Sequence, residues 1–288
     1  MPPSTVSKGW INGFIGVLIF SGSLPATRLA VIDLNPYFVT VARASIAGLI
    51  ALAVLLIGKQ KKPNTTDLGK LALTAFGVVL GFPLFSALAL QYITSANSIV
   101  FLGLLPLATA SFGVWRHGEK PKPAFWLFSA VGATLVVGFA VLQGFSTSAL
   151  GNGLMLLAII TCGLGYAEGA SLAKTLGGWQ VISWCLVISL PIMLPLTFYF
   201  LPNTATHISL AAWGGLLYVS VFSMFVGFIF WYKGMAQGGI ASISQLQLLQ
   251  PFFGLGIAAG VLHEHVSTLM IIITLGVIAC VAGSKKFA

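Results

Sequence analysis

The chain has 288 residues, of which 58% are hydrophobic and only 7% are charged. Soluble domains carry about 25% charged residues, so water is not the main solvent of this protein. A disordered chain is excluded too, because 21 Phe and 7 Trp residues supply more apolar surface than disordered segments contain. The composition predicts a polytopic membrane protein, and the formal net charge of +9 then reflects membrane topology rather than a nucleic-acid partner.

Ten apolar runs follow one another along the chain. A transmembrane helix needs about 20 mostly apolar residues, and continuous runs exclude a barrel, whose strands alternate in polarity. In chain order the runs are Trp10–Ala30, Pro36–Ile57, Lys70–Gln91, Thr94–Val114, Lys122–Leu142, Gly151–Ala173, Trp179–Phe200, Leu210–Tyr232, Gly238–Val261 and Val266–Gly283. Only short connections remain between them, so we expect no soluble domain.

Basic residues are unevenly distributed among these connections. With the N-terminus in the cytoplasm, twelve Lys and Arg residues fall on the cytoplasmic side, and only Arg28 falls on the opposite side, at the mouth of the first run. Cytoplasmic loops of membrane proteins carry such an excess. The sequence predicts a multi-pass protein of the bacterial inner (plasma) membrane with both termini in the cytoplasm.

Two pairs of residues recur at an offset of 145 positions, Pro106 with Pro251 and Glu119 with Glu264. The chain accordingly divides into halves of five runs each, 1–143 and 144–288. Because five is odd, the halves cross the bilayer in opposite directions, as do the inverted repeats of many secondary transporters. We therefore predict an all-α membrane protein with ten transmembrane helices in two inverted five-helix repeats.

The segment ALQYITSANSIVFLGLLPLATASFGVWRHGEKPKP resembles the span-three-to-five signature of the drug/metabolite transporter superfamily, EamA type, with small residues, a mid-span Pro and a Gly-Glu pair. The second half keeps Pro251 and Glu264 but has His263 where the pattern prefers Gly. Arg43 in VARASIAG resembles an Arg often found in the family's second span, whereas the equivalent ISWCLVIS lacks one. Over its whole length the chain looks closest to the YddG-type exporters of aromatic and other amino acids.

This resemblance implies a bundle with a central cavity between the halves and with the fifth and tenth spans at its periphery. It also implies that metabolites move, often outward, without ATP hydrolysis, and the sequence contains no GxxxxGK[ST] motif. We expect Pro106 and Pro251 to break their helices and to act in gating. We expect no cofactor and no obligatory protein partner.

An intramembrane enzyme or an assembly scaffold is the alternative from a different class. Asp33 and Asp67 lie in predicted loops, so the sequence lacks a pair of aspartates facing each other inside the membrane. The four His residues lie in loops or at membrane ends, which leaves no buried Ser-His dyad. The cluster His263-Glu264-His265 sits in a tight turn without a fourth ligand, so we predict no metal site. The sequence does not favour an enzyme.

Arg43 lies about two helical turns inside the second run. A charge in that position costs about 2.5 to 3.5 kcal/mol, a penalty that the many apolar residues of the same helix offset. Its position alone therefore does not establish a function. Arg43 either binds a substrate carboxylate or pairs structurally with a carbonyl group or a helix end.

Glu168 lies near the cytoplasmic end of the sixth run, among Gly163, Gly165 and Gly169, which permit close packing or local unwinding. A carboxylate inside a membrane is typical of a proton site or an amine site. The alternative is a solvated helix end. We expect no direct pairing with Arg43, because the two residues lie near opposite faces of the membrane.

The ninth run is the most polar. Ser244, Gln247 and Pro251 lie on one helical face, and the repeat equivalent of Gln247 is the apolar Leu102. We expect this face to line the cavity, with interhelical hydrogen bonding as the alternative. Further candidates for the cavity wall are Tyr166, Trp184 and Asn97.

The function predicted from these features is secondary transport of amino acids, aromatic and other, with broad specificity. Alternating access would move them, with export as the direction. The alternative within the same fold is a drug, sugar-phosphate or nucleotide-sugar transporter, which we expect to place more than one basic residue inside its spans.

Overall fold

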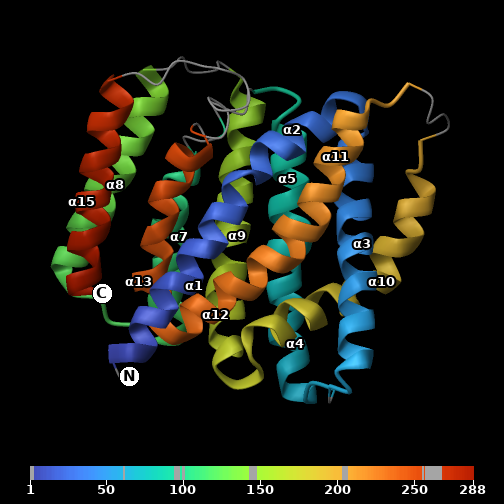
Figure 1. The fold of residues 1–288 in the computed structure, drawn as a ribbon, viewed down its shortest axis with the longest axis horizontal. Helices are drawn as coiled ribbons and strands as arrows, with labels where there is room; N and C mark the ends of the chain where they lie inside the picture. The colour runs from blue at the N-terminus through green and yellow to red at the C-terminus, as the bar shows by residue number, and fades with distance from the viewer. Residues whose placement is uncertain are drawn as a thin grey trace.

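The computed structural model describes residues 3–60, 62–93, 98, 101–142, 148–202, 207–254, 256 and 268–288. Within these ranges the regular elements are all helices, which stand side by side as a bundle (Figure 1). Six of the described helices are long and apolar enough to cross a membrane, and each of the ten predicted runs contains a helix. The predicted all-α membrane fold is confirmed.

The helices of the first half follow the predicted runs with two interruptions. They are α1 (Pro3–Ser21), α2 (Ser23–Asp33), α3 (Pro36–Ile57), α4 (Thr65–Ala75), the π-helical segment η1 (Phe76–Gly81), α5 (Phe82–Ala89), α7 (Leu105–His117) and α8 (Pro123–Leu142). The first run is thus two helices that meet at Gly22, and the third contains a π-helical segment.

The helices of the second half begin after residue 148. They are α9 (Ala149–Leu176), α10 (Gly178–Tyr199), α11 (Leu210–Tyr218), the π-helical segment η2 (Val219–Gly227), α12 (Phe228–Gly238), α13 (Ile240–Ser244), the 3₁₀ segment η3 (Gln245–Leu249) and α15 (Thr268–Phe287). The sixth and seventh runs are unbroken helices, although Pro191 and Pro195 lie inside α10.

The predicted start of the second run agrees with the structure because its capping chemistry is local. The Asn35 side chain accepts a hydrogen bond of 2.8 Å from the backbone N–H of Tyr37, and Pro36 occupies the first turn of α3, where its missing N–H is not needed. At about 1.5 Å per residue, a helix of this length crosses the hydrocarbon layer, and Arg43 lies in its N-terminal half.

The two halves share an irregularity at the offset found in the sequence. Helix α4 begins at Thr65 and α11 at Leu210, a difference of 145 residues, and the π-helical segments η1 and η2 occupy equivalent places within their spans. Packing follows the same symmetry, since α1 runs along α12 while α9 runs along α4, η1 and α5. The halves therefore interlock rather than standing side by side.

Glycines allow the closest of these approaches. A Cβ atom added to Gly77 of η1 would lie 2.8 Å from the Cα atom of Gly165 in α9, and one added to Gly234 of α12 would lie 2.6 Å from the backbone nitrogen of Gly13 in α1. Small residues let membrane helices bring their backbones into contact. Gly165 thus serves close packing, because α9 does not unwind around it.

Helices α8 and α15 pack against each other at one edge of the bundle, at the left in Figure 1. They are the fifth and tenth spans, so their place agrees with the peripheral position that the resemblance implied. Both chain termini lie at the same end of the bundle, as an even number of spans requires (Figure 1).

Candidate functional site: a cavity between the repeats

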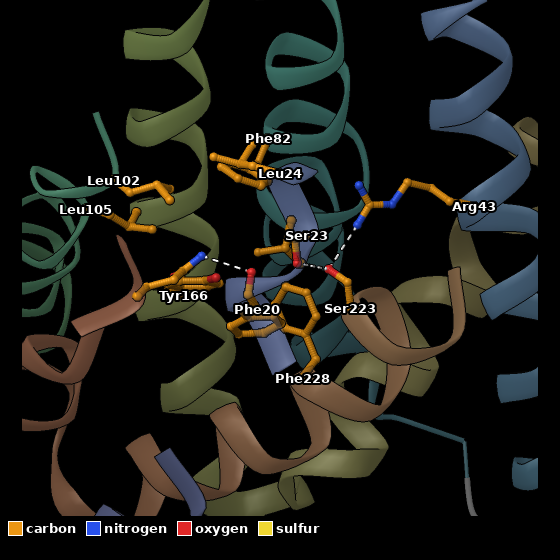
Figure 2. A pocket seen from close by; sticks show the side chains of 12 residues that line it. Phe20, Ser23, Leu24, Arg43, Phe82, Leu102, Leu105, Tyr166, Ser223 and Phe228 are labelled. Atoms are coloured by element: carbon orange, nitrogen blue, oxygen red, sulfur yellow. Dashed lines mark hydrogen bonds between the residues drawn. The ribbon is translucent and has the colours of Figure 1, made fainter. Parts of the chain in front are cut away.

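A narrow cavity lies between the two halves (Figure 2). Its free volume is about 20 Å³, which is enough for one water molecule. The lining residues come from both repeats, and they are Phe20, Ser23, Leu24, Arg43, Val78, Phe82, Leu102, Leu105, Tyr166, Ser223, Phe228 and Gln250.

Arg43 provides the single charge among the described lining residues. It extends from α3 toward Ser23 and Ser223 (Figure 2), and only 3% of its surface is exposed. One Nη atom donates to Ser223 Oγ at 3.3 Å, and Ser23 Oγ donates to the same oxygen at 2.7 Å. The Arg43 Nε atom has no hydrogen-bond partner among the described residues. Arg43, for which the sequence left a binding role and a structural role open, thus lies in the cavity wall.

The break between α1 and α2 lies beside Ser223, the hydrogen-bond partner of Arg43, because Ser23 at the start of α2 also bonds Ser223. A helix end leaves carbonyl groups without intrahelical partners. Here Tyr218 Oη donates to the carbonyl of Ile19 at 2.7 Å, and Gln250 Nε2 donates to the carbonyl of Phe20 at 3.1 Å. Ser23 then begins α2 with its side chain in the cavity. Both bonds join the first span to the second repeat.

Aromatic rings form the wall beside this polar group. The rings of Phe20 and Phe228 lie 5.1 Å apart in an edge-on arrangement, and the Tyr166 ring lies 5.8 Å from Phe228. Trp231 continues the cluster at 5.3 Å from Tyr166. Tyr166 therefore lines the cavity, as the sequence predicted.

Leu102 and Leu105 face the cavity from the opposite side, away from Arg43 (Figure 2). Their equivalents at the offset of 145 are Gln247 and Gln250, so the repeats contribute an apolar and a polar version of the same wall. Val78 and Ser223 are another such pair, one from each π-helical segment. Sequence reasoning missed Ser223, although the repeat offset pointed to positions of this kind.

Gln247 lies beside the wall rather than in it. It is 1% exposed and next to the Tyr166 side chain, yet neither polar atom of its amide has a hydrogen-bond partner in the part of the chain that the structure describes. Ser244 is not a lining residue either, and its hydroxyl donates to the carbonyl of Ala241 at 2.8 Å and faces the carbonyl of Pro106 at 3.5 Å. None of Ser244, Gln247 and Pro251 is among the described lining residues; Gln250, one turn beyond Gln247 and outside that predicted face, is the residue of this span in the cavity wall.

Both predicted helix-breaking prolines lie at irregular backbone. Pro106 stands in the first turn of α7, directly after a turn at residues 103–104. Pro251 lacks an N–H, so the carbonyl of Gln247 loses its α-helical partner. Instead the chain tightens into the 3₁₀ segment η3, and the N–H of Gln250 bonds that carbonyl. The break is therefore real, but it does not present a free carbonyl there.

Glu168 is buried, with 1% of its surface exposed, and is not a solvated helix end. Arg116, near the end of α7, donates through its Nε atom to Glu168, and His117 Nε2 lies 3.5 Å from the same carboxylate oxygen. The expected absence of pairing with Arg43 agrees with this arrangement. Glu168 therefore joins α9 to α7. Glu119, two residues beyond the end of α7, has other partners and accepts bonds of 2.8 and 2.7 Å from the N–H groups of Ile240 and Ala241.

Trp184, another residue that the sequence predicted for the cavity, lies elsewhere. Trp184 lines a separate cleft of about 530 Å³ together with Lys59, Lys62 and Gln180. Asn97 lies outside the described residues, as does the cluster 263–265. Within the described ranges no group of three or more His, Cys, Asp or Glu side chains is placed to hold a metal ion.

Known transporters are similar in sequence to most of this chain. The "uncharacterized transporter YdeK" of Bacillus subtilis (strain 168) is 61% identical over 282 residues, which are 98% of this chain and 98% of that protein. An "uncharacterized transporter" of Synechocystis is 24% identical and covers 87% of this chain and 82% of its own.

A crystal structure shares the fold, with a TM-score of 0.79 at 16% sequence identity over 97% of this chain and 99% of the other. The model of the EamA-like transporter family matches twice, at residues 7–142 and 149–284. These two matches together account for most of the chain. The protein therefore belongs to the EamA-like transporter family.

Proposed function

We propose that this transporter moves amino acids, aromatic and others, by alternating access, and that it resembles the YddG-type exporters in direction and breadth. The observation that carries the proposal is the composition of the cavity. Arg43 and Ser223 stand on one side and Leu102 and Leu105 on the other, with Phe20 and its aromatic neighbours between them. A carboxylate next to an apolar side chain fits such a site.

Broad specificity follows from the apolar wall. Aromatic and aliphatic side chains set few obligatory hydrogen bonds, so ligands are selected by size and apolar character more than by a particular polar group. The cavity as it stands is smaller than any amino acid, so binding requires the surrounding elements to move. The irregular segments η1, η2 and η3 adjoin the cavity, and π-helical and 3₁₀ segments are frequent at hinges and functional sites.

Gating and topology complete the proposal. The two family-model matches correspond to the halves 1–143 and 144–288, which would rock about the cavity with Pro106 and Pro251 at the moving breaks. The protein would reside in the inner membrane of a bacterium with both termini in the cytoplasm.

We propose Glu168 as the proton site. Protonation of this buried carboxylate would break its ion pair with Arg116 and release the end of α7. Flux of an amino acid that depends on a pH gradient in the native protein should become independent of that gradient in Glu168→Gln. Equal gradient dependence in both proteins would remove Glu168 from this role.

The central experiment is uptake of a labelled amino-acid panel into liposomes that contain only this protein. We expect neutral amino acids to equilibrate faster than in protein-free liposomes without ATP, and at least one aromatic amino acid to compete with the others. Flux of sugar phosphates or nucleotide sugars with no amino-acid flux would instead support the alternative substrate class. The lone charge of Arg43 among the described lining residues argues against that alternative.

A further inference from the structure

The charge in the central cavity has no counter-charge in the part of the chain that the structure describes. A guanidinium group has five N–H donors, and Arg43 forms one hydrogen bond of 3.3 Å while its buried Nε atom has no described partner. A buried charge without a partner is strongly unfavourable. The site is therefore incomplete until an anion enters.

No described carboxylate can take that place, because each is engaged or located elsewhere. Glu168 binds Arg116, and Glu119 caps α13. Asp33 is exposed and accepts from the N–H of Ser209 at 3.0 Å, while Asp67 lies in the first turn of α4. The fifth acidic residue, Glu264, lies outside the described residues. None of the described four lines the cavity.

Ser223 strengthens the preference for an anion. Its Oγ atom accepts one bond from Ser23 and one from Arg43, which uses both acceptor sites of a hydroxyl. The remaining Ser223 O–H can only donate, and it lies in the cavity wall. Arg43 and Ser223 thus offer several donors to one ligand group, and the planar fork of Arg matches a carboxylate.

The α-ammonium group of an amino acid meets no equivalent partner. It needs acceptors, preferably a carboxylate, and the acceptors among the described lining residues are all neutral. One cation also fits a monoanion better than a phosphate dianion. The cavity therefore recognises the carboxylate and the apolar side chain of its ligand, and the ammonium group adds little.

We propose that this transporter also takes apolar monocarboxylates that lack an amino group, such as 3-phenylpropanoate and its 2-hydroxy analogue. This inference rests on the proposed role of the central cavity as the transport site. It adds a class of substrate to the amino acids, defined by a carboxylate at Arg43 and an aromatic or branched group against Phe20 and Phe228.

Direct binding to the purified full-length protein in detergent tests the inference, because protonated carboxylic acids cross lipid without a carrier and obscure flux. Calorimetry at neutral pH would compare phenylalanine, 3-phenylpropanoate, 2-phenylethylamine and phenyl phosphate. We expect 3-phenylpropanoate to bind within about threefold of phenylalanine, and the amine at least about 30-fold more weakly, since it lacks the charge-assisted bonds. Binding of the amine but not of the acid would overturn the inference, as would tighter binding of phenyl phosphate.

Arg43→Met should weaken binding of both carboxylates about tenfold or more. The protein should still fold, because the substitution removes a buried charge that has no counter-charge. Arg43→Lys keeps the charge and loses the fork, so its affinity should be intermediate. Arg28→Met is the matched control, since Arg28 bonds the carbonyl of Leu90 and lies outside the cavity lining. Unchanged carboxylate affinity in Arg43→Met would overturn the inference.

Competition in liposomes separates this inference from the proposed function. If labelled phenylalanine equilibrates and 3-phenylpropanoate does not compete, the inference fails and the proposed function stands. If 3-phenylpropanoate binds in an Arg43-dependent way and phenylalanine does not move, the proposed amino-acid transport fails and the inference stands.

Discussion

Arg43 is 3% exposed in a span whose other residues are largely apolar, and the sequence left two roles open for it. A structural role requires a strong partner, such as a carboxylate or several carbonyl groups. The structure provides one bond of 3.3 Å to Ser223 among the described residues. A single long bond does not offset the burial of a full charge, which supports the ligand-binding role that we propose.

The substitution Gln247→Leu tests whether Gln247 binds the substrate or only packs between helices. If the Gln247 amide contacts the substrate, the variant loses a hydrogen bond worth about 0.5 to 1.5 kcal/mol, or about 2- to 12-fold in affinity. Thermal stability should hold or rise, because the buried amide has no partner among the described residues. Calorimetry and thermal unfolding of the same detergent-purified variant give both quantities.

Gln245→Leu is the matched control for this experiment. Gln245 lies in the same 3₁₀ segment, is fully buried and also has an amide without a described partner, but among the described residues only Gln247 of the two interacts with Tyr166 of the cavity wall. We expect its substrate affinity to match that of the native protein. Equal losses in the two variants would mean that η3 as a whole, rather than Gln247, affects binding.

The sequence predicted some of the cavity and not the rest, for a physical reason. Arg43, Tyr166 and the polar face near Gln247 differ from their apolar surroundings, so composition alone makes them visible. Phe20, Leu102 and Ser223 are ordinary residues for a membrane helix, and only the packing of two repeats turns them toward one space. Trp184 was predicted on residue type and lies in another cleft.

At the scale of elements, the ten spans could be predicted because each needs a continuous apolar run. The π-helical segments, the 3₁₀ segment and the break at Gly22 could not, because they depend on contacts between spans. Gly22 faces the Tyr218 hydroxyl, with 2.5 Å between that oxygen and an added Cβ atom. The break between α1 and α2 thus lies where Tyr218, at the end of α11, packs against Gly22.

We expect two Gly→Ala substitutions in α9 to change stability in opposite directions, because only Gly165 packs against η1. In Gly165→Ala the new Cβ would lie 2.7 Å from Val78 Cγ1 and 3.1 Å from the Cα of Gly77, so we expect a loss of about 1 to 3 kcal/mol in stability. In Gly153→Ala the Cβ has nothing within 4 Å, so the better helix former should add up to about 1 kcal/mol. Thermal unfolding in detergent measures both, and a stabilised Gly165→Ala protein would refute the close packing.

The N-terminal end of α13 is capped by Glu119, a residue from the other repeat. Gly118, with φ of 66°, turns the chain after α7 so that Glu119 reaches the first N–H groups of α13. Glu119→Ala should remove this cap and lower stability by about 0.5 to 2 kcal/mol, whereas Ala at the exposed neighbour Lys120 should change it little. If both variants unfold at the native temperature, the cap does not stabilise the protein.

At the scale of the whole molecule, the transporter consists of two inverted repeats whose equivalent positions differ in polarity. Equivalent positions of the repeats, such as Leu105 and Gln250, face one cavity, so the scaffold is shared while one repeat supplies the polar side. A symmetric scaffold has two equivalent closures, one toward each side of the membrane. The alternating access that we propose would use these two closures to expose the same residues to each side in turn.

The sequence predicts the orientation of the whole bundle from its basic residues, of which twelve are expected on the cytoplasmic side and one on the opposite side, with Arg43 inside a span. Lys62 belongs to the basic face and His207 to the connection between α10 and α11, at the opposite end of the bundle. Single Cys residues at these positions, in a variant without the buried Cys162, Cys185 and Cys280, would report their side in intact cells. An impermeant thiol reagent should label position 207 and leave position 62 protected until the membrane is opened. Labelling at 62 with protection at 207 would reverse the topology, and the cavity would then meet its substrate from the other side.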